Sequence, residues 1–553
     1  MSNISKKEKH KADIREDSWE TFGPLSETIQ VRASMALLDI HRNGIVTDLA
    51  RAKWLRNQLL KKIKLSTNAI CLMENYCAYF NLESGQKLNS KKKTLENLLL
   101  QAREEIKIQF PNADILPVPL NSQGQISLST KQWGIYSSYH SFIHHWTQIE
   151  KACKYLQFVE FHSPVSHSKY TTLVRNGRAS ASRPNIQQMP RDGGYREIFC
   201  ARENHVFVIC DYSFIELCTL AVVCERKFGF SMLANVIRKG IDPHCFTAAM
   251  FEKVTLDEFM TWKDSENPDL RSKFKNSRQR AKAINFGIPG GEGAVALKEY
   301  AKSAYQVELT LEESERFREI LIHEVYPELS LYLFEDCMDI LAKRLGVPVA
   351  ACWKRFAGKR KKSPAIALAI RNILAGKLYK SNGRPYQEKW VQSVWRTIQA
   401  LNKNPALAPL IERYYMTGNE NLSRKLFGSE VATITGRVRG GITFTQGCNT
   451  PFSGLASDGA KLSLFNLLHI GYRLVAFIHD EIVVEIPDSS DFDKEAKIIN
   501  DVMCESMQQV TKNMPIKCEY SVSRRWCKGA VPVYKDGKLT IWEPTDNYEL
   551  PNE

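Results

Sequence analysis

The stretch VFVICDYSFIELCTLAVV, residues 206–223, contains the clearest change from strand to helix in the chain. VFVIC is a short, apolar and β-branched run that suits a buried strand, and IELCTLAVV suits a packed helix. Asp211 lies between them, where the end of a strand would hold its carboxylate in a fixed position. Asp is common in turns and at helix N-termini, so Asp211 alone does not indicate a catalytic role. It would do so if a second carboxylate lay beside it in the fold.

A second carboxylate lies at the tip of an expected β-hairpin. LVAFI (474–478) and EIVVEI (481–486) are apolar runs on either side of His479-Asp480, a two-residue connection. Magnesium is usually held by one or two carboxylates together with substrate phosphates. If Asp211 and Asp480 meet in the fold, they could bind two Mg²⁺ ions, one for an attacking hydroxyl and one for a leaving oxygen. The sequence alone leaves open whether they meet.

A third candidate is SRQRAKAINFGIPGG, residues 277–291. Arg278, Lys282 and Phe286 are four residues apart, which predicts that they share one face of a helix, with Gly290 next on that face. Such a face could hold a triphosphate and stack a base. The alternative is a solvated basic face with one Phe docked in the core. The glycines that follow lack the Lys-Ser or Lys-Thr of a Walker loop.

Composition sets broader limits. The 553 residues, 43% of them hydrophobic, are enough for several domains with a substantial core. A net charge of +15 favours a polyanionic partner. No run of about 18 apolar residues occurs, so we expect no membrane association. The N-terminus has no secretory pattern, and the fourteen Cys residues include no C-x-x-C pair, which together predict a reduced, cytoplasmic protein.

These segments together resemble motifs A, B and C of the family A DNA polymerases, as VICDYSFIELCTLA, RQRAKAINFG and VAFIHDEIVVE. GRASASRPNIQQMPR (177–191) is similar to the loop ahead of motif A, and NTPFSGLASDGAKLS (449–463) to the helix ahead of motif C. IDPHCFTAAMF (241–251) resembles the family's D-x-H-x-x-T-A segment. The motifs follow the family's order, which makes the resemblance specific over residues 31–526, with one large interruption.

The resemblance implies an α+β, right-hand polymerase fold with an antiparallel palm sheet, helical fingers and a helical thumb. Six segments follow from it: a basic tail (1–29), an N-terminal segment with the thumb (30–160), a first palm part (161–225), the fingers (226–335), a basic insertion (336–428) and a second palm part (429–553). Trp353, Arg355 and the basic residues 359–362 make the insertion a candidate DNA-binding element. The alternative is a solvated helical insertion without a specific role.

The resemblance also implies a set of catalytic and nucleotide-binding residues. Asp211 and Asp480 would hold two Mg²⁺ ions, with Glu481 as a third carboxylate of lesser importance. The incoming triphosphate would contact the side chains of Arg278, Lys282 and His244, and Phe286 would stack on its base and sugar. Lys282 would also donate a proton to the leaving pyrophosphate.

Further positions correspond to residues that select the sugar and hold the primer-template. Glu216 corresponds to the steric gate that excludes the 2′-hydroxyl of ribonucleotides. Arg178 and His479 would seat the primer end, and Asn449 would lie near the template. Asn185 and Ser453 are expected to contribute to primer-template binding.

Three positions depart from the family pattern. Gly290 replaces a Tyr that in relatives helps to cover the templating base and supports the steric-gate Glu. Ser453 replaces a Gln that contacts the minor groove, and Phe214 stands where motif A often has Gln. The acidic residues of motifs A and C are intact, so we predict an active enzyme with altered nucleotide checking.

The sequence therefore predicts a template-directed DNA polymerase that adds deoxynucleoside triphosphates to a DNA primer-template and works as a monomer. The residues ahead of the polymerase segment are too few for an exonuclease, so we expect no proofreading. Alternatives are a single-subunit RNA polymerase, against which Glu216 and His479-Asp480-Glu481 argue, an enzyme that copies RNA into DNA, and an inactive DNA-binding protein. The host, the pathway (replication, repair or lesion bypass) and any processivity partner stay open.

Overall fold

The computed structural model describes residues 25–77, 92–111, 118–119, 126–161, 163–172, 174, 176–191, 193–336, 429–442 and 444–544. The tail up to residue 24 and the basic cluster of the predicted insertion, including Trp353 and Arg355, lie outside these residues. Within the described ranges, no helix is both long and apolar enough to cross a membrane.

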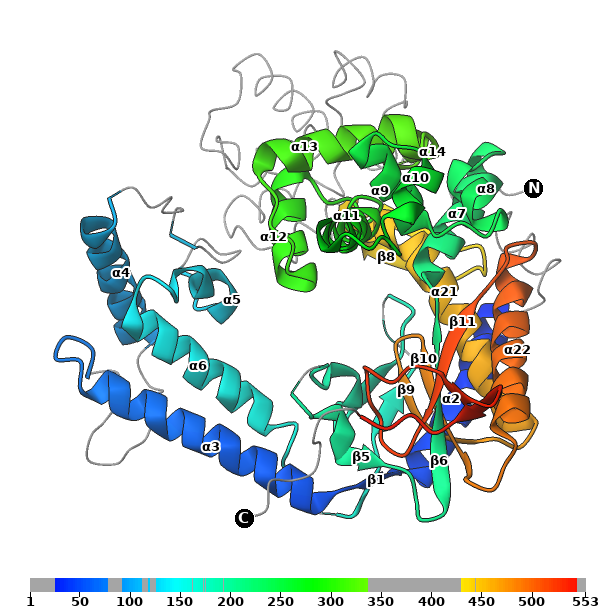
Figure 1. The fold of residues 1–553 in the computed structure, drawn as a ribbon, viewed down its shortest axis with the longest axis horizontal. Helices are drawn as coiled ribbons and strands as arrows, with labels where there is room; N and C mark the ends of the chain where they lie inside the picture. Colours follow the sequence, from blue (N-terminus) through cyan, green and yellow to red (C-terminus); the bar gives the residue numbers. More distant parts are fainter. Residues whose placement is uncertain are drawn as a thin grey trace, which may run out of the picture.

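A four-stranded antiparallel sheet forms the centre of the molecule (Figure 1). Its order is β11 (Cys518–Ser523), β6 (His205–Tyr212), β10 (Glu481–Pro487) and β9 (Arg473–Ile478). The apolar runs predicted as strands form β6, β9 and β10, and the last two are joined by His479-Asp480, so the predicted hairpin is confirmed. β6 and β10 are the two inner strands, which explains why both are buried along nearly their whole length.

Helices cover one face of this sheet, and a smaller sheet lies against the other. The first group comprises α2 (Leu25–Asn43), α7 (Ile215–Phe228), α21 (Phe444–His469) and α22 (Phe492–Thr511). Val208 and Val484 point into their core. Alternate residues such as Phe207 and Val483 point to the other side. There the core is shared with the sheet of β2 (Val165–Ser166), β1 (Ile45–Thr47) and β5 (Phe199–Cys200).

A helical layer follows α7 in the sequence and stands above the sheet in Figure 1. It contains α8 (Met232–Arg238), α9 (Pro243–Glu252), α10 (Leu256–Thr261), α11 (Pro268–Gly287), α12 (Ala294–Tyr305), α13 (Leu311–Ile320) and α14 (Glu328–Ser330). Short π-helical turns follow α13 at Leu321–Val325 and α14 at Leu331–Asp336. A capping box of Thr310 and Glu313 opens α13, with both reciprocal hydrogen bonds present.

A helical arm extends from the opposite end of the sheet (Figure 1). It consists of α3 (Leu49–Cys71), α4 (Lys92–Gln109), α5 (Thr130–Trp133), a 3₁₀ turn at Gly134–Tyr136 and α6 (Ser141–Leu156). Their apolar faces share a separate core that includes Trp133 and Trp146.

The segment that carries the loop motif 177–191 is partly regular. β4 (Ser180–Ser182) pairs with β3 (Lys169–Thr171), and 3₁₀ turns follow at Ile186–Gln188 and Arg196–Ile198. Two further hairpins join β7 (Ser429–Ala432) to β8 (Val438–Ile442) and β12 (Val533–Lys535) to β13 (Lys538–Thr540). Strands of three to five residues carry too little periodicity to be recognised by pattern.

One prediction about α11 is wrong. Gly290 does not continue the face of Arg278, Lys282 and Phe286, because the helix ends at Gly287. The next residues form a turn in which the amide of Gly291 bonds the carbonyl of Ile288 at 2.9 Å. Pro289 has no N–H to donate back into the helix, so the regular ladder cannot pass through it.

Candidate active site

The edge of the central sheet brings the predicted acidic residues together. Asp211 on β6 is the direct antiparallel partner of Glu481, the first residue of β10, and Asp480 precedes Glu481 in the hairpin turn. On its other side Asp211 pairs with Glu519 of β11. Burial, together with the negative charge of Asp211, raises the pKa of the Asp480 carboxyl to about 8.

The backbone is held in a left-handed conformation on both sides of this acidic group. His479 has φ +61° and Phe214 has φ +41°, values that non-glycine residues seldom adopt. His479 forms the hairpin turn before Asp480, and Phe214 is the N-cap residue of α7, three positions after Asp211. Such conformations persist only where the surrounding structure determines them, and they are concentrated at functional sites.

Glu481 is fixed by an indole and a guanidinium. Its Oε1 accepts a hydrogen bond from Trp526 Nε1 at 2.6 Å and lies 3.4 Å from Nη1 of Arg196. The Arg196 guanidinium also lies over the Trp526 ring, 4.2 Å from its centroid. All three side chains are buried, so Glu481 has little freedom to move and its Oε2 is left to face the acidic group.

An exposed ammonium bridges the acidic residues. Lys528 Nζ lies 3.2 Å from Asp211 Oδ2 and 3.5 Å from Glu481 Oε2. The second carboxylate oxygen of Asp211, Oδ1, is buried and has no hydrogen-bond partner. The negative charge of this edge is therefore only partly neutralised by the protein's own cation.

The carboxylates of Asp211, Asp480 and Glu481 could bind divalent metal ions if other ligands complete the coordination shell. Among the residues that the structure describes, no three or more His, Cys, Asp or Glu side chains are arranged to hold a metal by themselves. The unpaired oxygen of Asp211 and the adjacent Asp480 are the donors that Mg²⁺ prefers, and Mg²⁺ commonly completes its shell with water and phosphate oxygens. The site suits an ion that arrives with a phosphate ligand.

The two predicted cations of α11 differ in their surroundings: Arg278 pairs with Asp242, and Lys282 lies within electrostatic range of the acidic edge. Arg278 donates two hydrogen bonds to Asp242 Oδ2, from Nε at 3.0 Å and Nη2 at 2.6 Å. Burial lowers the pKa of Lys282, and the positive charges of Arg278, Arg191 and Lys528 lower it further. Lys528 is the residue that contacts Asp211, so Lys282 belongs to the same electrostatic environment as the carboxylates.

His244 is buried and held in one protonation state. Its Nδ1 lies 3.1 Å from Nδ2 of Asn285, which is also within hydrogen-bond distance of the Pro243 carbonyl and of Thr247 Oγ1. Burial lowers the pKa of His244 to about 3, so the ring is neutral near pH 7. If Nδ1 accepts a hydrogen bond from this amide, the ring proton resides on Nε2.

Arg178 and Glu216 form an ion pair at the same edge. The turn before Arg178 is anchored from behind: the Gly177 carbonyl accepts hydrogen bonds from Ser457 Oγ and Lys461 Nζ, both at 2.7 Å. Gly177 has φ +86°, which glycine adopts without strain. α21 thus positions the loop that carries Arg178.

Arg178 and His479, two of the predicted primer-template residues, lie at this edge, but in the part of the chain that the structure describes the other three do not share a hydrogen bond with it. Asn449 is exposed on α21, while Ser453, one turn later, is buried. Asn185 lies in the loop before β5, and its side-chain oxygen is buried without a partner. Within the described ranges, no hydrogen bond joins these three residues to Asp211 or Asp480.

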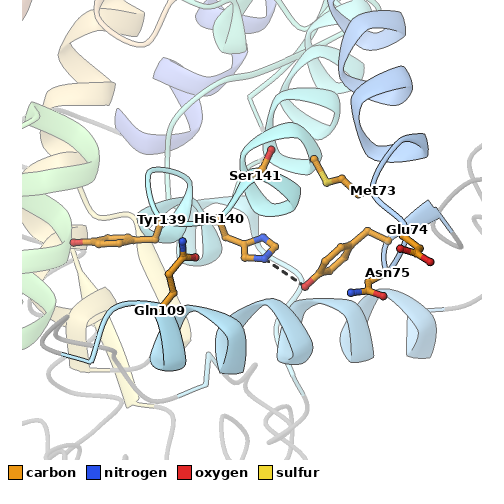
Figure 2. Close-up of a pocket in the computed structure, with 8 residues that line it drawn as sticks. Met73, Glu74, Asn75, Gln109, Tyr139, His140 and Ser141 are labelled. Carbon is orange, nitrogen blue, oxygen red and sulfur yellow. Dashed lines mark hydrogen bonds between the residues drawn. The ribbon is translucent and has the colours of Figure 1, made fainter.

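A separate hollow lies on the helical arm, between the end of α3 and α6 (Figure 2). Its polar groups pair with one another: Tyr76 Oη lies 3.4 Å from His140 Nε2, which lies 2.9 Å from Oε2 of Glu105. The carboxylates of Asp211 and Asp480 are not among its lining residues, so it is not part of the acidic site.

Several residues of this environment escaped the sequence analysis. Arg191 ends the quoted loop motif and contributes positive charge near Lys282. Trp526 and Lys528 follow β11, and the pairing of β11 with β6 returns them to the acidic motifs. Arg196 lies in the 3₁₀ turn before β5 and contacts Glu481. Asp242 was visible in the IDPHCFTAAMF segment, but its pairing with Arg278 was not.

Comparison with known proteins agrees with the motifs. The family model for DNA polymerase family A matches residues 55–344, which include Asp211 and all of α11. DNA polymerase I of Aquifex aeolicus (strain VF5) is 26% identical over 362 residues, which cover 64% of this chain and 44% of that protein. DNA polymerase I of Rhizobium leguminosarum is 33% identical over 136 residues, which cover 24% of this chain and 12% of that protein. The chain therefore spans less than half the length of these relatives.

A solved structure shares the fold. It is described as the POL domain of Pol1 from M. smegmatis in complex with DNA primer-template and dNTP. The match has a TM-score of 0.53 at 17% sequence identity and covers 90% of this chain and 70% of that one. The expected right-hand α+β fold is confirmed by this similarity. The family model covers more than half of the chain, and so the chain belongs to DNA polymerase family A.

Proposed function

We propose that this protein is a template-directed DNA polymerase that extends the 3′ end of a primer with deoxynucleoside triphosphates. The observation that carries the proposal is the meeting of Asp211 and Asp480 at one sheet edge, within electrostatic reach of Lys282 on α11. Membership of DNA polymerase family A supports it. A monomeric enzyme that works in the cytoplasm is part of the same proposal.

The triphosphate would be bound by the cations of α11 and by His244. Lys282 and Arg278 supply positive charge, and His244 Nε2–H supplies a neutral donor. Arg278 is already oriented by Asp242, so little side-chain entropy would be lost on binding. Phe286 lies on the same helix face, with its ring centroid 5.4 Å from that of His244, and would stack on the base and sugar.

Asp211 and Asp480 would hold two Mg²⁺ ions, with Glu481 fixed beside them. When bound, magnesium supplies positive charge that activates the primer hydroxyl and neutralises the phosphates. The attack of the primer 3′-oxygen on the α-phosphorus forms one P–O bond and breaks the bond to pyrophosphate. Lys282 would donate a proton to that leaving group, and burial, which lowers its pKa, makes it a better acid.

Glu216 would act as the steric gate against ribonucleotides, and Arg178, its ion-pair partner, would seat the primer end together with His479. Asn185, Asn449 and Ser453 remain candidates for primer-template contacts. Ser453 would have to become accessible on DNA binding, because it is buried in the described structure.

The test is extension of a labelled primer on DNA and on RNA templates, with deoxy- or ribonucleotides and Mg²⁺. DNA-templated incorporation of deoxynucleotides supports the proposal. Efficient ribonucleotide polymerisation would favour an RNA polymerase, and comparable use of an RNA template would favour a reverse transcriptase-like enzyme. DNA binding without any extension would indicate an inactive DNA-binding protein and would overturn the proposal.

A further inference from the structure

The aromatic surface around Phe286 contains two tyrosines from the next helix. Tyr305, the last residue of α12, has its ring parallel to that of Phe286, with an interplanar angle of 3° and a centroid separation of 6.4 Å. The ring of Tyr300 meets Tyr305 edge-on at 5.6 Å. Phe286 is thus flanked by His244 on one side and by this tyrosine pair on another.

Two features of α11 let the tyrosines approach so closely. Gly287 has no side chain, and a Cβ atom there would lie only 2.8 Å from Leu297 Cδ1 and 3.2 Å from Tyr300 Cδ1. Gln279 Nε2 lies 3.4 Å from the Tyr305 carbonyl oxygen, which links the end of α12 to the middle of α11. The turn at Ile288–Gly291 reverses the chain between the two helices.

The tyrosine pair is also close to the carboxylate of Glu216. Burial raises the pKa of both phenols, and the negative charge of Glu216 raises each of them further. The two phenols also interact with each other through a side-chain hydrogen bond. A stacked ring, a hydrogen-bonded phenol pair and the carboxylate therefore line one side of the proposed nucleotide site.

Gly290 contributes no ring beside Phe286, so the aromatic groups there can come from another helix. It contributes no side chain, and a Cβ atom there would contact only the carbonyl oxygens of Gly287 at 3.4 Å and of Phe286 at 3.6 Å. α11 therefore presents no aromatic ring after Phe286, and the rings beside Phe286 come from α12.

We infer that Tyr305, oriented by Tyr300, is a specificity-determining residue that limits the space beside Phe286 and Glu216 and so disfavours nucleotides carrying a 2′-hydroxyl. The inference rests on the proposed polymerase function and adds a selecting residue to it. Tyr305 would narrow the pocket with its ring, and Tyr300 would keep that ring in place through its edge-on contact and the bond between the two hydroxyls.

The experiment compares wild type, Tyr305→Ala, Tyr305→Phe and Tyr300→Phe in single-nucleotide insertion. Each is assayed with a deoxynucleotide and with the matching ribonucleotide, and kcat/KM is measured for both. Tyr305→Ala removes the ring that limits the space beside the sugar, so the ratio of kcat/KM for the deoxynucleotide to that for the ribonucleotide should fall by about tenfold. Tyr305→Phe and Tyr300→Phe keep both rings and lose one hydrogen bond, so a decrease of about two- to fivefold is expected.

Tyr534→Ala is the matched control. Tyr534 also pairs its phenol with that of another tyrosine, Tyr520, at 3.4 Å. Tyr520 on β11 pairs with Cys210, the residue before Asp211 on β6. Successive strand residues point to opposite faces of a sheet, so the Tyr520 side chain lies on the face opposite to that of Asp211. The ratio of the two kcat/KM values should stay at the wild-type level in this variant.

A second readout needs no turnover. The dissociation constants of the deoxynucleotide and the ribonucleotide are measured on a template annealed to a dideoxy-terminated primer. Weaker discrimination by Tyr305→Ala in binding as well as in insertion supports the inference. If wild type extends primers and Tyr305→Ala keeps the wild-type ratio in both assays, the inference is overturned and the proposed function stands. If wild type neither binds nor inserts nucleotides, both are overturned.

Discussion

Asp211 on β6 is the direct antiparallel partner of Glu481 on β10, the residue that follows Asp480 in the hairpin turn. Directly opposed residues project from the same face of a sheet, so this single register brings two distant motifs to one point. A slip of one residue would turn Asp211 to the opposite face relative to β10. The apolar residues of β6 and β10, buried on both faces, hold the register.

Asp211→Asn and Asp480→Asn should each lower primer extension by on the order of a thousandfold or more, because each removes a charge proposed to hold metal. Affinity for primer-template should change little, since DNA binding depends mainly on contacts to the phosphate backbone. Extension is followed on a gel and DNA affinity by fluorescence anisotropy. Asp488→Asn, on the loop after β10, is the control. Near-normal extension by either active-site variant would remove the metal assignment.

Trp526→Phe should lower the free energy of unfolding by about 1–2 kcal/mol, because it leaves the buried Oε1 of Glu481 without the indole hydrogen bond. It should also raise the Mg²⁺ concentration needed for half-maximal extension, since Glu481 is no longer fixed. Trp133→Phe is a matched control, as its indole donates to the Ser127 carbonyl on the helical arm. An equal change of Mg²⁺ requirement in both variants would show that the effect is a general loss of stability.

Lys528→Ala should increase the affinity of the free protein for Mn²⁺ by roughly threefold, because the ammonium near Asp211 and Glu481 competes with a metal cation. Electron paramagnetic resonance titration measures this binding without DNA, nucleotide or turnover. Lys535→Ala, on the distant β12–β13 hairpin, should bind Mn²⁺ as wild type does. Weaker Mn²⁺ binding in the Lys528 variant would contradict the prediction.

Lys461 predicts a pH dependence of stability. It is fully buried behind the Arg178 loop, and burial lowers its pKa from 10.5 to about 7. Between these values the unfolded chain binds more protons than the folded protein, so the free energy of unfolding should rise with pH over that window. Denaturant unfolding at several pH values measures the slope.

Lys461→Met should remove much of that slope, although the loss of the bond to the Gly177 carbonyl will also lower stability at every pH. Lys535→Met on an exposed hairpin should keep the wild-type slope. An identical slope in the Lys461 and Lys535 variants would show that another group is responsible.

Gly290→Tyr should leave the selection between deoxy- and ribonucleotides close to the wild-type ratio. The new ring would project from the turn after α11 and would not continue the face of Phe286. Space exists for its Cβ atom, so the variant should fold. The kcat/KM ratios are compared with those of Tyr305→Ala. A large gain in discrimination would mean that the ring reaches the pocket despite the turn.

The sequence by itself determined the local elements and the residue types of the chemistry. The apolar runs around Asp211 and Asp480 predicted β6, β9 and β10, because a buried inner strand must be apolar on both faces. The spacing of Arg278, Lys282 and Phe286 predicted the face of α11, because a helix has a fixed period. Periodicity failed at Pro289, where the missing N–H ends the helix.

Only the tertiary structure decided which groups meet. Strand pairing sets Asp211 beside Glu481, and the chain after β11 returns Trp526 and Lys528 to the same edge. Helix packing across Gly287 sets Tyr305 against Phe286, and no spacing in the sequence relates these two rings. A local pattern in the sequence shows which face of a helix or strand is apolar. Contacts between distant elements depend on how these faces pack together, and no local period in the sequence gives that packing.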